Sequence, residues 1–155
     1  MTPSKLNVAY SYSWVLPFVD TSQVRAIIES LRQYIIALGS ESVSDVIVLT
    51  GNEAQAVRSD ADHIIMFTAI VPNAKSEGGP QRYGLGFSPE KKSWSWSGTV
   101  RVSSFKEISG LMVHAASLGI CFVGTTFAGM IVEYKRNAEG EIEVQQRPAF
   151  DWTDF

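Results

Sequence analysis

The chain is poor in the side chains that most often carry redox, metal and acid–base chemistry. Its 155 residues include one cysteine, Cys121, and two histidines, His63 and His114. One thiol cannot form an internal disulfide bond or a cysteine-rich zinc site. His63 follows Asp60 and Asp62 closely, but a zinc or iron site needs three or four ligands. We therefore expect no bound metal.

The chain also lacks a large excess of positive or negative charge, and it lacks long apolar runs. The formal net charge is −3, and the only adjacent basic pairs are Lys91-Lys92 and Lys135-Arg136. Nucleic-acid binding is disfavoured, because proteins of that class usually carry a basic patch that neutralises phosphates. No segment reaches the roughly 20 apolar residues of a membrane span, and the first residues do not resemble a signal peptide. We expect no membrane contact and a cytoplasmic location.

The sequence motifs of common catalytic and nucleotide sites are absent as well. The glycines at positions 78–86 match neither G-x-x-x-x-G-K-[ST] nor a G-x-G-x-x-G between a strand and a helix. The chain contains no G-x-S-x-G and no H-E-x-x-H. Gly84 and Gly86 alternate within a predicted strand, where they would make room for a large neighbour such as Trp94 or Trp96. We expect no cofactor, and a non-catalytic protein is favoured.

What the chain does have is a regular succession of strands and helices. Large side chains at every second position from Leu6 to Trp14 predict a strand with one apolar face. Apolar residues at three- and four-residue steps predict two amphipathic helices, at positions 20–39 and 105–118, each with a capping-box pair at its start. Further strands are predicted at 45–50, 63–71, 82–87, 93–102, 120–126, 129–136 and 141–146, and a helical turn at 52–58.

These elements predict one α+β domain that covers residues 1–155. Six to eight strands form a mainly antiparallel sheet, and the two helices pack on one of its faces. The strand–helix–strand order leaves a mixed sheet, with some parallel pairing, as the alternative. Residues 147–155 (RPAFDWTDF) are expected to form a C-terminal tail that alternates aromatic residues with acidic or polar ones.

Two aromatic segments are candidates for contact with a protein partner. Trp94 and Trp96 alternate with serines in one strand, and the tail carries Phe150, Trp152 and Phe155. Exposed aromatic rings are enriched at binding hot spots, and an extended tail with aromatic anchors can dock on another subunit. For both segments the alternative is packing within the same domain.

A pocket between a helix and the sheet is the second hypothesis. Its candidate residues are His114, Glu107, Tyr10, Tyr12 and Arg82. Histidine is the usual acid–base group near neutral pH, and Glu107 lies two turns from His114 on one side of the second helix. The alternative for His114 is an ordinary, partly exposed surface side chain.

The sequence thus favours a non-catalytic binding protein that acts through a protein partner, such as an inhibitor, a toxin-neutralising protein or an assembly subunit. The competing hypothesis is a small-molecule-binding protein or an enzyme with its pocket between helix and sheet. Self-association is a further expectation, because symmetric homodimers are the commonest oligomers.

Overall fold

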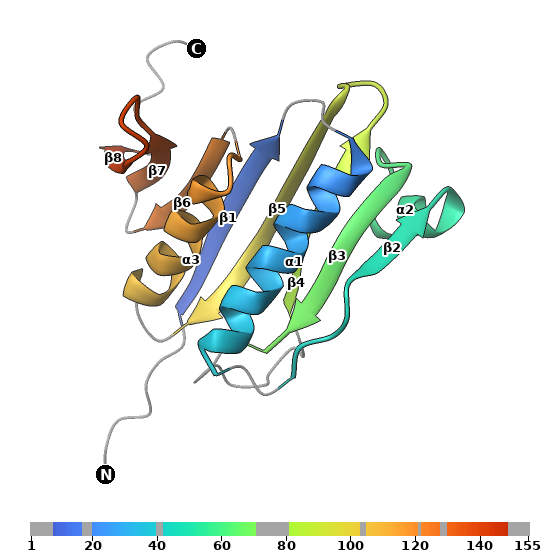
Figure 1. Cartoon of the computed structure of the whole chain (residues 1–155), viewed down its shortest axis with the longest axis horizontal. Helices are drawn as coiled ribbons and strands as arrows, with labels where there is room; N and C mark the ends of the chain where they lie inside the picture. Colours follow the sequence, from blue (N-terminus) through green and yellow to red (C-terminus); the bar gives the residue numbers. More distant parts are fainter. Residues whose placement is uncertain are drawn as a thin grey trace.

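The structure of the chain is a computed structural model that describes residues 8–16, 20–39, 42–70, 81–102, 105–120, 122–127 and 130–148. One sheet of eight strands runs through it in the order β2-β3-β4-β5-β1-β6-β7-β8 (Figure 1). The strands are β1 (Val8–Leu16), β2 (Ile47–Thr50), β3 (His63–Ala69), β4 (Gln81–Ser88), β5 (Ser93–Val102), β6 (Phe122–Phe127), β7 (Met130–Arg136) and β8 (Ile142–Pro148). The helices are α1 (Thr21–Ala37), α2 (Asn52–Val57) and α3 (Phe105–Ser117).

All pairings between the described strands are antiparallel, so the predicted α+β domain with an antiparallel sheet is confirmed. The helix α1 connects β1 to the edge strand β2, and α3 connects β5 to β6 on the far side of β1. Each long helix therefore joins two strands that run in the same direction but have antiparallel strands between them. This arrangement explains why strand–helix–strand signals occur in a sheet without parallel pairs among its described strands.

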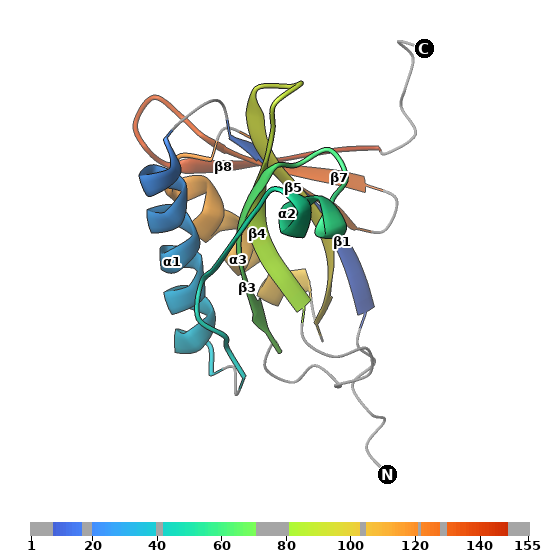
Figure 2. The ribbon, with the colours of Figure 1, turned by 90° about the vertical axis from the view of Figure 1, so that its right-hand side faces the viewer.

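The two long helices cover one face of the sheet, as predicted, and the short α2 lies against the other face (Figure 2). The helix α1 begins at a capping box, in which Asp20 accepts from the Gln23 amide at 3.0 Å and Gln23 accepts from the Asp20 amide at 3.2 Å. Its buried stripe consists of Val24, Ile28, Leu31 and Ile35. No helix within the described ranges is long and apolar enough to cross a membrane.

The core lies between these helices and the aromatic side of the central strands. In β1 the buried residues are Tyr10, Tyr12, Trp14 and Leu16, which alternate with smaller side chains. The register pairs Trp14 with Trp96 and Leu16 with Trp94 across β1 and β5, so these large side chains share one face. Alternation with period two thus sorts the central strands into a covered aromatic face and an open face.

Of the predicted C-terminal tail, residues 147 and 148 belong to β8, and residues 149–155 lie outside the described part of the chain. Phe150, Trp152 and Phe155 therefore remain a prediction about partner contact.

Candidate binding site on the open face of the sheet

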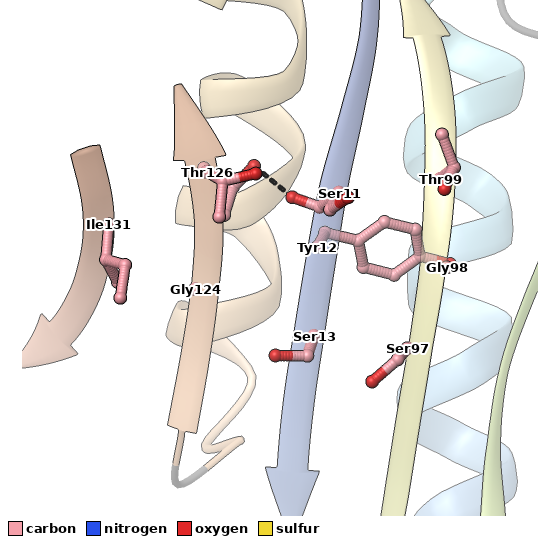
Figure 3. Close-up of a pocket in the computed structure, with 10 residues that line it drawn as sticks. Ser11, Tyr12, Ser13, Ser97, Gly98, Thr99, Gly124, Thr126 and Ile131 are labelled. Atoms are coloured by element: carbon pink, nitrogen blue, oxygen red, sulfur yellow. Dashed lines mark hydrogen bonds between the residues drawn. The ribbon is translucent and has the colours of Figure 1, made fainter. Parts of the chain in front are cut away.

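The face of the sheet opposite α1 and α3 carries small hydroxyl side chains. Ser11 and Ser13 of β1, Ser97 and Thr99 of β5 and Thr126 of β6 alternate with buried residues of the same strands, so they point to this side. All but Ser13 are exposed. Together with Gly124 and Ile131 they line an open hollow of about 590 Å³. Figure 3 shows how these residues lie on their strands. We call this region the hydroxyl face.

The described residues that line the hollow of the hydroxyl face carry no charge. None of the ten residues that line its hollow carries an ionisable acid or base, apart from the phenol of Tyr12. That phenol is buried and its hydroxyl donates to the Arg82 carbonyl at 3.0 Å. The hollow can therefore offer hydrogen bonds and van der Waals contact, but its lining residues hold no pair of groups for acid–base catalysis.

Next to this hollow, β4 and β5 separate. Their ladder joins residues 86–88 to residues 93–95 and, in the described strands, does not continue, although β4 starts at Gln81 and β5 runs to Val102. Along this stretch of β4, side chains replace the backbone of β5 as hydrogen-bond donors to the β4 carbonyls. The carbonyl of Arg82 accepts from the Tyr12 hydroxyl at 3.0 Å, and the carbonyl of Gly84 accepts from Trp14 Nε1 at 2.8 Å.

Arg58 holds the point where the two strands divide. Its guanidinium donates to the carbonyl of Ser95 at 2.6 Å and to the carbonyl of Gly86 at 3.2 Å, which bridges β5 and β4. It also donates to Asp60 at 2.6 Å, which compensates its charge. A Cβ at Gly86 would lie 3.1 Å from this guanidinium, so the glycine leaves room for it. Arg58 is therefore a structural clamp.

Beyond the clamp, the separated strands leave a second hollow of about 500 Å³ on the open side, which we call the β4/β5 cleft. Its lining consists of Val57, Arg58, Arg82, Trp96, Ser97, Gly98 and Thr99. Positions 97–99 also line the hydroxyl face, so the two hollows adjoin along β5. The side chain of Arg82 is exposed and forms no ion pair or hydrogen bond with any described residue.

Trp94 and Trp96, the predicted partner contacts, are 3% and 7% exposed and belong to the core. Trp96 Nε1 donates to the Tyr12 hydroxyl at 3.0 Å, and the Trp94 ring contacts those of His63 and Phe87. Of the two alternatives for this pair, the structure thus favours packing within the domain.

The residues of the hypothetical helix–sheet pocket do not come together. Tyr10 and Tyr12 are buried in the core, whereas the side chain of Arg82 is exposed on the opposite side of the sheet. His114 lies half-buried between α1 and α3, where it stacks on Tyr34 at 4.6 Å and its Nε2 lies 3.2 Å from Ser30 Oγ. The side chain of Glu107 is outside the described part of the structure.

Three buried tyrosines have a raised pKa, and none of them is a candidate acid or base near neutral pH. Desolvation by burial, and secondarily the neighbouring Tyr83, raises the pKa of Tyr12 well above 10.0. Burial likewise raises the pKa of Tyr83, and that of Tyr134 despite its hydrogen bond to Ser109. Among the described residues, no three histidine, cysteine, aspartate or glutamate side chains are grouped to hold a metal ion.

Sequence reasoning missed Arg58, Ser11, Ser13 and Thr99. A signal for the serines was present, because Ser11 and Ser13 alternate with Tyr10, Tyr12 and Trp14 just as Ser95 and Ser97 alternate with the two tryptophans. Nothing local marks Arg58, since its partner Ser95 lies 37 positions away.

Comparison of the chain with protein-family models, with curated proteins and with solved structures found no significant match in any of the three.

Proposed function

We propose that this protein is a non-catalytic binding protein that contacts a protein partner through the hydroxyl face of its sheet. The observation that carries the proposal is the one-sided covering of the central strands. Two long helices bury the aromatic side, while Ser11, Ser97, Thr99 and Thr126 remain exposed on the other. A broad, open surface of this kind suits a macromolecule better than a small molecule, which usually binds in an enclosed cavity.

The chemistry of the hydroxyl face supports a protein as the partner. Serine and threonine side chains both donate and accept hydrogen bonds, so they can satisfy the polar groups of another polypeptide. Their short side chains lose little conformational entropy when they are immobilised, which lowers the cost of association. None of the described residues that line the hollow has a charged side chain whose desolvation would oppose burial.

The positions of the hollows favour this proposal over the alternative of a small-molecule site. Both adjoining hollows, at the hydroxyl face and at the β4/β5 cleft, lie on the side that α1 and α3 leave open. A pocket between helix and sheet would require a cavity on the aromatic side, where Tyr12, Trp14 and Trp96 are buried. The proposed setting is the cytoplasm, and a second copy of the chain is one partner that the same experiment detects.

The test is native mass spectrometry of the untagged protein purified from its own host. We expect a second polypeptide, or a second copy, at defined stoichiometry. Ser11→Arg places a long cation in the middle of the hydroxyl face and should abolish that species. Gln33→Arg, on the exposed side of α1, is the matched control and should retain it. Circular dichroism establishes that both variants fold. An unchanged complex in Ser11→Arg, or a wild-type monomer without any bound polypeptide, would contradict the proposal.

A further inference from the structure

We propose that the β4/β5 cleft binds an extended acidic segment of the partner, which adds alongside β5 and pairs a carboxylate with Arg82. This inference rests on the proposed function and specifies where the partner is held. It also predicts the chemistry of the bound segment.

The first argument is the edge of β5 beyond Ser95, which pairs with no described strand on the side of β4. The carbonyl of Ser95 points toward β4, where it meets Arg58. Backbone groups along an antiparallel strand point alternately to its two neighbours. Ser97 and Thr99 therefore direct their N–H and C=O groups toward β4 as well, into the stretch where the described ladder has ended. An unpaired strand edge is a template for another extended segment, because each added residue supplies the matching donor and acceptor.

The second argument is that β4 does not compete for this edge. Its carbonyls at Arg82, Gly84 and Gly86 accept from Tyr12, Trp14 and Arg58 respectively. These donors are side chains fixed by other parts of the core and by Asp60, so the separation does not depend on a ligand. The cleft is thus preorganised, which reduces the entropy that binding must overcome.

The third argument is charge. Arg82 extends from β4 on the open side and forms no ion pair within the described part of the chain, whereas the neighbouring Arg58 is compensated by Asp60. A guanidinium that has no partner among the described residues, beside the exposed hydroxyls of Ser97 and Thr99, matches a carboxylate and the amides that flank it. The guanidinium of Arg82 in the cleft lining thus favours an acidic segment over a basic one.

The experiment uses the full-length, ¹⁵N-labelled protein and the capped peptide Ac-Thr-Glu-Thr-Glu-Thr-NH₂, whose alternation places both carboxylates on one side. We expect saturable shifts of the amide signals of Ser97, Gly98 and Thr99. Affinity should fall about tenfold or more for Arg82→Gln, which corresponds to the loss of about 1.4 kcal/mol from one partly desolvated ion pair. Arg82→Gln leaves intact the backbone oxygen that Tyr12 bonds, and Arg25→Gln, exposed on α1, is the matched control.

Three outcomes would overturn the inference. These are the absence of saturable shifts at about 5 mM peptide, equal affinity of the wild type and Arg82→Gln, and equal affinity for the matched peptide with Gln in place of Glu. Inorganic phosphate that alone reproduces the shifts of all three amides would also overturn it, because a free anion would then suffice. The titration needs no natural partner, so its failure is distinguishable from loss of the complex in the mass-spectrometry experiment.

Discussion

The two faces of β1 and β5 differ in exposure and polarity, although they are formed by alternate residues of the same two strands. The aromatic side holds Tyr12, Trp14 and Trp96 under two helices, and their polar atoms are hydrogen-bonded to one another or to β4. The other side presents exposed hydroxyls at Ser11 and Ser97. The comparison teaches that stability and binding are divided by side-chain parity, so neighbouring positions should give opposite phenotypes.

The largest expected effect is Trp14→Ala. The side chain is fully buried, and its Nε1 is the donor for the Gly84 carbonyl. Loss of its packing should lower the free energy of unfolding by about 3–5 kcal/mol. Urea denaturation followed by circular dichroism measures it. The control is the next residue, Ser13→Ala on the hydroxyl face, which should change stability by less than about 0.5 kcal/mol. Similar losses in both variants would remove the distinction between the faces.

Gly98→Ala should have the next largest effect, because it adds one methyl group to the aromatic side of β5. A Cβ there would lie 2.9 Å from the hydroxyl oxygen of Tyr12 and equally close to its ring. Tyr12 would have to move away from its bonds to Arg82 and Trp96, at a cost of about 1–3 kcal/mol. The adjacent Thr99→Ala, on the open side, should be nearly neutral in the same urea experiment. A stable Gly98→Ala protein would mean that the Tyr12 ring is loosely held.

Tyr12→Phe keeps the ring and removes only its hydroxyl. That oxygen donates to the Arg82 carbonyl and accepts from Trp96 Nε1, so the substitution leaves both groups in the core without their partner. We expect a loss of about 1–2 kcal/mol, consistent with the cost of an unsatisfied buried polar group. Thermal unfolding of the variant, compared with the wild type at neutral pH, measures it. No loss would show that solvent replaces the hydroxyl.

Much of this fold could be predicted from periodicity, whereas the cleft could not. The strand of β1, the capping box at Asp20 and the buried stripe of α1 follow from local spacing. The separation of β4 from β5 depends on Tyr12 and Trp14, which lie 70 positions before their acceptors. The two strands at 82–87 and 93–102 are predicted from the sequence, but no local pattern shows how far a ladder between them extends. Contacts of such long range emerge only when the strands are assembled.

Only part of the candidate site could be predicted from the sequence, for the same reason. Arg82 was singled out as a possible pocket residue, but its exposure beside Ser97 and Thr99 depends on where the ladder ends. His114 was considered with Glu107 on its own helix, yet its described contacts come from Ser30 and Tyr34 of α1. Helix periodicity gives the side of a helix on which a residue lies, but it does not give the element packed against that side.

The smallest expected effect on stability at neutral pH is that of Tyr83→Phe. Like Tyr12→Phe, it removes a single buried hydroxyl, so the two variants can be compared directly. The Tyr83 hydroxyl is buried and has no hydrogen-bond partner in the described part of the chain, so removing it should leave stability unchanged or raise it by up to about 1 kcal/mol. Burial raises the pKa of Tyr83 above the 10.0 of an unfolded tyrosine. Above about pH 10 the unfolded phenol therefore ionises while the folded one remains protonated, and the wild type loses stability as pH rises. Melting temperatures measured between about pH 8 and pH 11 should fall less steeply for Tyr83→Phe than for the wild type. Equal slopes would mean that the Tyr83 phenol ionises as readily in the folded protein as in the unfolded chain.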